Sequence, residues 1–351
     1  MSGNPKILSV ATAVPAHRIG QGEVKDFARD MFGEAHQDID RLLPVFDNVD
    51  IENRHFCVPK EWFGEDHTFA EKNDLYLENA LRLSEKAARR ALDKAGVEAA
   101  EIGALFFVST TGLATPSLDS KLIFELGIPE RHTRREALFG HGCAAGAGGL
   151  ARAADWSRGH PGRPVLLIAT ELCGLTFQRG DTSKANMIST SLFADGAAAV
   201  VIGADGDGPE LVGEDCITWP GTEDVMGWKF TETGFNVILS RSVPVIVQNY
   251  FRDSLYDSCD YLGLDPGDLE HFVLHPGGAK VLDALEVALD IEPGSLSLSR
   301  GVLRDYGNMS AATVLFILQR FIAGGEYERG DLGLISAMGP GFSAEHVFFR
   351  C

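Results

Sequence analysis

The chain of 351 residues is 45% hydrophobic and 23% charged, values typical of a globular protein with a large core. Its net charge of −19 argues against general binding to nucleic acid or to an anionic membrane. No apolar run is long enough to span a membrane and residues 1–5 lack a signal-peptide layout, so we expect a cytoplasmic protein without integral membrane association. The scattered cysteines show neither metal spacing nor a disulfide pattern, which predicts free thiols and no bound metal.

In chain order, residues 6–13 predict a first strand, and residues 27–66 have no clean period and predict only helix and loop. Apolar residues then recur at helical spacing over 77–92, and Gly96 follows as a C-terminal cap. Three continuous apolar runs predict buried strands: 104–109, 165–169 and 197–202. Strands that alternate with helices predict a mostly parallel sheet in an α/β protein.

The second half repeats the order of elements in the first half. The strand at 271–274 corresponds to the strand at 104–108, and each follows an apolar-Gly-apolar turn. Gly307-Asn308 opens a helix at 309–323 just as Gly142-Cys143 opens an Ala-rich helix. An internal repeat of this length predicts two similar halves that share one core. Loop residues mark the boundary at 205–225, so we divide the chain into residues 1–215 and 216–351.

Cys143 lies in the glycine-rich run GHGCAAGAGG, directly before a helix predicted at 150–156. Backbone N–H groups and the helix dipole at such a turn favour a thiolate, which suits a nucleophile. A small cysteine buried against glycines is the alternative interpretation. Partners are therefore needed before chemistry can be inferred.

His275 and Asn308 supply those partners, because each also stands beside glycine at the start of a helix. His275 follows a strand at 272–274 and precedes a helix at 279–289. An imidazolium stabilises a thiolate, so we expect the pKa of Cys143 to lie well below that of a free thiol. An Asn amide and a His N–H can together donate to a carbonyl oxygen that gains negative charge.

Five motifs stand out, and three of them contain these residues: GHGCAAG at Cys143, SLFADGAAA at Phe193, HPGG from His275, YGNMSAA at Asn308 and MGPGF at 338–342. Together they resemble the type III polyketide synthases, the chalcone-synthase-like branch of the thiolase fold, over essentially the whole chain. This resemblance implies a duplicated αβαβα layered core. Residues 223–235 and 240–244 look most like bacterial alkylpyrone and alkylresorcinol synthases.

The resemblance also implies an acyltransferase mechanism with CoA thioesters as substrates and no further cofactor. Cys143 would take the starter from an acyl-CoA and hold the growing chain, while His275 and Asn308 would stabilise the enolate formed from malonyl-CoA. Phe193 matches an aromatic gate between the CoA tunnel and the cavity, and the family implies a homodimer. The other matched positions line the cavity, the CoA arm or the cavity floor: Thr111, Cys173, Thr176, Trp228, Val237, Ser310, Gly277, Gly278 and Gly339.

Two departures from the plant enzymes concern the cavity wall, and a third concerns CoA. Val237 replaces a second aromatic gate, and Trp228 stands where plant relatives have Gly, which predicts a long thin starter such as a fatty acyl-CoA. The product would then be an alkylpyrone or alkylresorcinol. Residues 47–52 are acidic where plant relatives grip the CoA phosphates. Arg54, Lys60 and Lys280 are candidate replacements that the sequence leaves unassigned.

Three alternatives stay open at this point. A ketoacyl synthase III would use the same Cys-His-Asn set for a single condensation, but its motifs resemble HQAN and GNTS. A naphthalene-forming type III synthase would use malonyl-CoA itself as the starter. A non-catalytic lipid-binding protein of the thiolase fold would be expected to have lost one of the three residues.

Overall fold

The computed structural model describes residues 3–33, 35–36 and 38–351. Its centre is a mixed sheet with the strand order β11-β12-β13-β8-β1-β7-β6-β4-β5. The strands of the first half are β1 (Lys6–Ala13), β4 (Ala104–Val108), β5 (Arg134–Leu138), β6 (Val165–Leu172) and β7 (Asp195–Gly203). Those of the second half are β8 (Glu210–Thr218), β11 (Leu269–Leu274), β12 (Leu332–Gly339) and β13 (Ser343–Arg350).

The strand order confirms the duplication. The order β1-β7-β6-β4 in one half matches β8-β13-β12-β11 in the other, and the two halves meet where β1 pairs with β8. The pairing senses also match, antiparallel for the first two pairs and parallel for the third. The predicted division after residue 215, which lies within β8, stays a prediction.

The expectation of a mostly parallel sheet is wrong, because β1, β7, β8 and β13 all pair antiparallel with their neighbours. Among the named strands of the described residues, only β4 with β5, β4 with β6, and β11 with β12 are parallel pairs. Parallel neighbours require a long crossover connection, whereas β13 follows β12 after a short turn. Apolar runs reveal that a strand is buried, but they do not reveal its direction.

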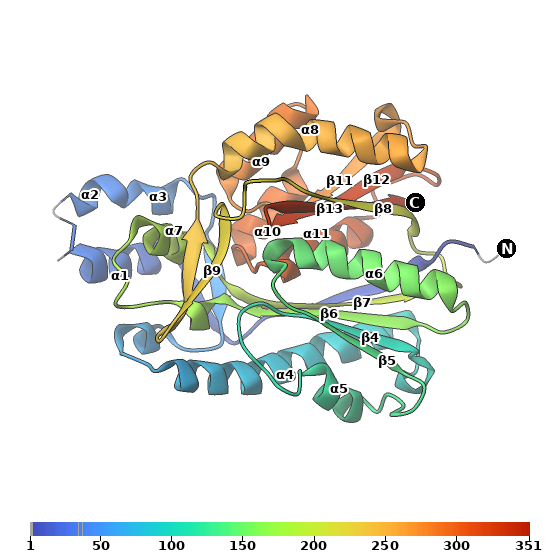
Figure 1. Cartoon of the computed structure of the whole chain (residues 1–351), viewed down its shortest axis with the longest axis horizontal. Helices are drawn as coiled ribbons and strands as arrows, with labels where there is room; N and C mark the ends of the chain where they lie inside the picture. The colour runs from blue at the N-terminus through green and yellow to red at the C-terminus, as the bar shows by residue number, and fades with distance from the viewer. Residues whose placement is uncertain (1–2, 34, 37) are drawn as a thin grey trace.

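Helices and sheet form five layers (Figure 1). One outer layer contains α4 (Phe69–Ala95) and α5 (Asp119–Leu126), and the other contains α8 (Val243–Leu262) and α9 (Ala279–Leu289). Between the two halves of the sheet lie α6 (Ala145–Gly159) and α11 (Ala311–Gly324). This arrangement is the αβαβα core of the thiolase fold, as expected.

Burial on both faces explains the continuous apolar runs. In β4, Phe106 and Val108 pack in the core around α6 and α11, whereas Leu105 and Phe107 pack in the core around α4. The helix α4 begins earlier than the predicted 77–92, because Thr68 and Glu71 form a capping box at its start. Gly96 ends it in the left-handed conformation (φ 63°), as predicted.

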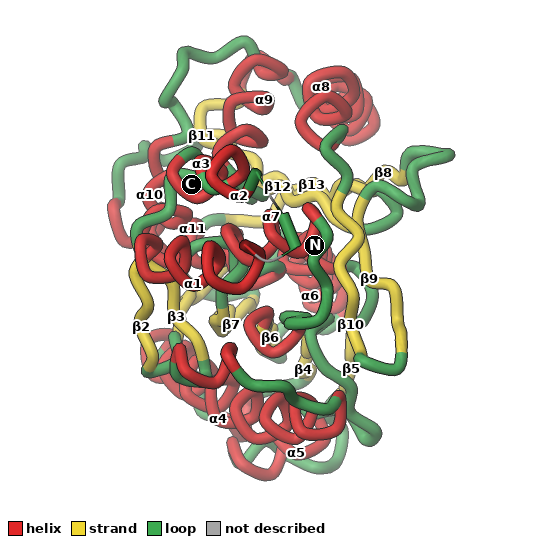
Figure 2. The backbone as a smooth tube through the Cα atoms, turned by 90° about the vertical axis from the view of Figure 1, so that its left-hand side faces the viewer, coloured by secondary structure: helices red, strands yellow, loops and turns green. Residues whose placement is uncertain are grey.

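The segments with weak sequence patterns gather at one end of the core (Figures 1 and 2). Four of them are helical: α1 (Gln21–Gly33), α2 (Ile39–Leu42), α3 (Pro44–Asp47) and the 3-10 helix η1 (Lys60–Gly64). Two small sheets pair β2 (His17–Gly20) with β3 (Asn53–Phe56) and β9 (Met226–Thr231) with β10 (Gly234–Leu239). Two further helices, α7 (Lys184–Leu192) and α10 (Ser297–Tyr306), complete the fold. None of the helices in the described ranges is long and apolar enough to cross a membrane.

Candidate active site

The nucleophile candidate lies in a tight turn at the start of the central helix α6. Cys143 is in the 3-10 helix η3 (Gly142–Ala144), which continues directly into α6. Gly142 has φ 49°, and a Cβ there would lie 2.7 Å from the Pro340 side chain. At the end of β12, a Cβ on Gly339 would lie 2.3 Å from the backbone oxygen of His141. Glycine at 142 and 339 therefore lets the turn that contains Cys143 pack closely against the end of β12.

Cys143, His275 and Asn308 line one cavity of about 520 Å³. All three are at least 95% buried. His275 follows β11, and its backbone N–H donates to the Ser336 oxygen at 2.9 Å. Asn308 stands between α10 and α11. The structure thus brings together three residues that the sequence separates widely.

Hydrogen bonds fix the orientation of the Asn308 amide. Its Oδ1 accepts from the backbone N–H of Ser310 at 2.8 Å, and its Nδ2 donates to the Gly277 oxygen at 3.1 Å. The Ser310 donor identifies which side-chain atom is the oxygen. Since Nδ2 has two N–H groups, one remains for a substrate oxygen.

The electrostatics of the pair differ from the sequence-based expectation. Burial raises the pKa of the Cys143 thiol to about 12, although the hydrogen bond to Ser310 Oγ at 3.5 Å opposes that shift. Burial also lowers the pKa of His275 to about 3. The predicted low thiol pKa is therefore wrong for this structure, because the loss of water outweighs the helix N-terminus. Both shifts favour the uncharged forms, a thiol at Cys143 and a neutral imidazole at His275.

His275 has no hydrogen-bond partner on either ring nitrogen among the described residues. A neutral imidazole carries one N–H donor and one free acceptor nitrogen. It can therefore accept a proton from a thiol or donate one hydrogen bond to a substrate oxygen.

Glu171, which our sequence analysis missed, is a buried carboxylate near this site. Its Oε2 accepts from the Thr110 N–H at 2.9 Å and from Thr111 Oγ1 at 2.8 Å, whereas Oε1 has no partner in the described part of the chain. Burial raises the pKa of Glu171 to about 7, against the effect of these hydrogen bonds. The available signal was a glutamate two residues beyond the apolar run 165–169.

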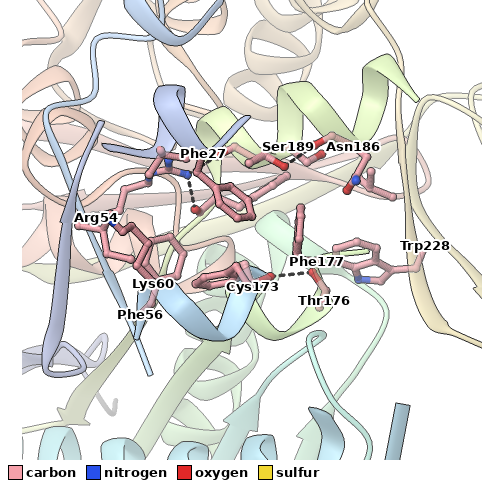
Figure 3. A pocket seen from close by; sticks show the side chains of 17 residues that line it. Phe27, Arg54, Phe56, Lys60, Cys173, Thr176, Phe177, Asn186, Ser189 and Trp228 are labelled. Carbon is pink, nitrogen blue, oxygen red and sulfur yellow. Dashed lines mark hydrogen bonds between the residues drawn. The ribbon is translucent and has the colours of Figure 1, made fainter. Parts of the chain in front are cut away.

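The predicted cavity residues divide between separate spaces. Cys173, Thr176, Trp228 and Val237 line a second cavity of about 60 Å³ (Figure 3), whereas Thr111 lines a third, much smaller one. Trp228 and Val237 are directly opposite each other on the β9–β10 hairpin. Much of the remaining wall of the second cavity consists of four aromatic side chains: Phe27, Phe56, Phe63 and Phe177.

Phe193 is the one predicted residue that lines both of the larger cavities. It directly follows α7 and forms a parallel bridge with Asn308. It therefore lies between the second cavity and the cavity lined by Cys143, His275 and Asn308, which we call the catalytic cavity. Ser310 lines neither of these two cavities, but its Oγ accepts a hydrogen bond from the Cys143 thiol.

Four exposed basic residues line the catalytic cavity together with Gly277 and Gly278: Arg41, Lys184, Arg241 and Lys280. Of the three candidates for CoA phosphates, only Lys280 is in this group. Arg54 is 1% exposed and lines the second cavity. Lys60 also lines the second cavity, and its Nζ donates to Glu23 at 3.2 Å. The described residues contain no cluster of three or more His, Cys, Asp or Glu suited to a metal ion.

Two family models together match almost the whole chain. The N-terminal domain of chalcone and stilbene synthases matches residues 1–206, and the C-terminal domain matches residues 212–351. The chain therefore belongs to the chalcone and stilbene synthases, the type III polyketide synthases, and is an acyltransferase. This confirms the resemblance read from the motifs.

Individual relatives are similar over nearly their full lengths. A putative chalcone synthase of Bacillus subtilis (strain 168) is 41% identical, with 98% of each chain covered. The 1,3,6,8-tetrahydroxynaphthalene synthase of Streptomyces peucetius subsp. caesius is 36% identical, covering 98% of this chain and 92% of that one. The crystal structure of the 1,3,6,8-tetrahydroxynaphthalene synthase from Streptomyces coelicolor A3(2) matches with a TM-score of 0.94. Its sequence is 32% identical, with 98% of this chain and 99% of that chain covered.

Proposed function

We propose that this enzyme loads a fatty acyl group from CoA onto Cys143 and extends it with malonyl-CoA to an alkylpyrone or alkylresorcinol. The observation that carries this proposal is the position of Phe193 between the catalytic cavity and a second, mainly apolar cavity. A chain bound to Cys143 can pass Phe193 and bury its methylenes among aromatic side chains.

Loading begins when neutral His275 accepts the proton of the Cys143 thiol. As this proton moves, the sulfur attacks the thioester carbonyl of the starter; the bond from that carbonyl to the CoA sulfur then breaks, and CoA leaves as a thiol with the proton from His275. The products are an acylated Cys143 and free CoA. A thiol with a raised pKa needs this proton transfer to occur together with the attack.

Extension begins when malonyl-CoA loses CO₂. The electron pair of the broken carbon–carbon bond forms an enolate, whose oxygen accepts hydrogen bonds from the His275 N–H and from the free N–H of Asn308 Nδ2. The enolate carbon then attacks the acyl-Cys143 carbonyl and forms a new carbon–carbon bond, while the bond from that carbonyl to the Cys143 sulfur breaks and its electron pair stays on the sulfur. The products are a β-ketoacyl-CoA and the Cys143 thiolate, ready for another cycle.

The volume of the second cavity limits the starter. At roughly 10–15 Å³ per water-sized group, about 60 Å³ accommodates a few such groups beyond Phe193. Each buried methylene contributes about 0.8 kcal/mol, so four to six of them favour a medium or long chain over acetyl by about 3–5 kcal/mol.

The basic residues around the catalytic cavity support CoA binding. We assign the phosphates of CoA to Arg41, Lys184, Arg241 and Lys280, four exposed cations in a chain of net charge −19. A local cationic site of this kind attracts an anionic substrate in spite of the overall charge. We also propose a homodimer, which sedimentation velocity would test.

A second candidate uses malonyl-CoA as the starter and forms a hydroxylated naphthalene, the kind of product that the names of the tetrahydroxynaphthalene synthase relatives give. Incubation with malonyl-CoA alone, and with malonyl-CoA plus acyl-CoAs of increasing length, separates the two by product mass. Alkyl products with a preference for six or more carbons support our proposal. A hydroxylated naphthalene from malonyl-CoA alone would support the second candidate.

A further inference from the structure

Arg54 is a buried cation that neither the proposed chemistry nor CoA binding uses. It lies in β3 and is 1% exposed. Its Nη1 donates to the backbone oxygens of Thr190 and Phe193 at 2.6 and 2.9 Å. These oxygens are at the C-terminal end of α7, where carbonyls lack helical donors and a positive charge is favourable. Arg54 therefore holds the end of α7 and the gate Phe193.

The stem of the same side chain contacts the segment that contains Asn308. A Cβ on Gly307 would lie 2.7 Å from Arg54 Cγ and 2.8 Å from its Cδ. Only glycine lets the backbone before Asn308 approach this closely. Backbone hydrogen bonds also join Asn308 to the end of α7. The Asn308 backbone N–H donates to the Leu192 oxygen at 2.9 Å, and the Asn308 backbone oxygen accepts from the Ala194 N–H at 2.8 Å. Arg54, the gate and Asn308 thus form one packed unit.

The charge of Asp195 partly offsets the desolvation of the Arg54 guanidinium. Asp195 lies in the same unit, and its carboxylate accepts from Gly174 and Cys57 backbone N–H groups at 2.7 and 2.8 Å. Burial lowers the pKa of Arg54 to about 9 while the charge of Asp195 opposes that shift, so the guanidinium stays protonated at neutral pH. Its Nε and Nη2 find no partner among the described residues. A buried donor without a partner is destabilising, so this guanidinium is costly to the fold.

We propose that Arg54 is a positioning residue, which orients Asn308 toward the malonyl-derived enolate and holds Phe193 between the two cavities. This inference rests on the proposed function, because the role of Asn308 in decarboxylation belongs to it. Arg54 acts through backbone groups and does not touch the reacting atoms. Loading of Cys143 depends less on this unit than decarboxylation does.

The test compares the two half-reactions in Arg54→Met, which keeps the stem against Gly307 and removes the donors. We expect the rate of Cys143 acylation to stay within about threefold of wild type. The rate of malonyl-CoA decarboxylation should fall at least about tenfold, because a displaced Asn308 stabilises the enolate oxygen less well. Arg54→Lys retains a charge that can reach one carbonyl, so it should regain part of the decarboxylation rate.

Arg158→Met is the matched control. Arg158 is a partly buried arginine in α6 that donates to the Leu211 oxygen at 3.1 Å and pairs with Glu214, and it lines neither larger cavity. This variant should lose stability but leave the ratio of the two half-reactions unchanged.

Each outcome bears on one proposal. If wild type neither loads an acyl-CoA nor decarboxylates malonyl-CoA, the proposed function fails and this inference falls with it. If wild type is active and a folded Arg54→Met retains wild-type decarboxylation, or loses both half-reactions equally, only the positioning role is overturned. If Arg54→Met does not fold, Arg54→Lys decides, and unchanged decarboxylation in that variant overturns the role.

Discussion

Replacing Glu171 by Gln should make the protein more stable at alkaline pH. The folded-state pKa of Glu171 is raised by burial from 4.5 to about 7, so the unfolded chain releases this proton more easily. Stability from the protonated carboxyl is present below pH 4.5 and is lost as the pH rises to about 7. At about 1.4 kcal/mol per pKa unit, the ionised side chain destabilises the fold by about 3 kcal/mol at pH 8.

The glutamine side chain removes this ionisation and keeps the geometry. Its oxygen replaces Oε2, which accepts from Thr110 and Thr111, and its NH₂ replaces the unpartnered Oε1. For a chain of this length, 3 kcal/mol corresponds to a rise in Tm of about 4 °C. The difference in free energy of unfolding between the variant and wild type should shrink to under about 1 kcal/mol at pH 5, where Glu171 is protonated in the folded protein.

Thermal unfolding of both proteins from pH 5 to pH 8 measures this gap. Glu130→Gln removes a charge at an exposed position and serves as the control. Parallel Tm curves for wild type and Glu171→Gln would refute the reasoning, because they would show that Glu171 ionises equally in the folded and unfolded states.

The remaining predictions concern the active site and its two larger cavities. Cys143→Ala should abolish acyl loading, whereas Asn308→Ala should keep loading and lose malonyl-CoA decarboxylation by about a hundredfold, as radiolabel and CO₂ release would show. The rate of Cys143 alkylation by iodoacetamide should inflect above the free-thiol value of about 8.5, because burial raises its pKa; an inflection below that value contradicts the structure. Val237→Phe should reduce kcat/KM for long starters at least about tenfold without changing decarboxylation, since it fills the second cavity; an unchanged chain-length profile argues against the alkyl passage. Lys280→Ala should raise the KM for malonyl-CoA about two- to fivefold, whereas the exposed Lys86→Ala should not.

Features that depend on neighbouring residues were predictable from the chain. The helix predicted at 279–289 matches the bounds of α9, and Gly96 ends α4 as a cap, because periodicity and capping are local. The repeat was readable for a similar reason, since each half preserves its own order of elements. The motifs at Cys143, His275 and Asn308 combine reactive side chains with the glycines that their tight turns need. The sequence therefore identified these residues, although it did not show that they lie close together.

Other properties depend on residues brought together from distant parts of the chain. The direction of β1 and β7 depends on which strands they pair with, so the apolar runs could not exclude a mostly parallel sheet. Arg54 was a candidate for CoA phosphates by charge alone, but packing against Gly307 and the end of α7 places it in the interior. The pKa of Cys143 also depends on distant residues. The local sequence predicts the helix N-terminus, which lowers this pKa, but the burial that outweighs it comes from residues of both halves of the fold.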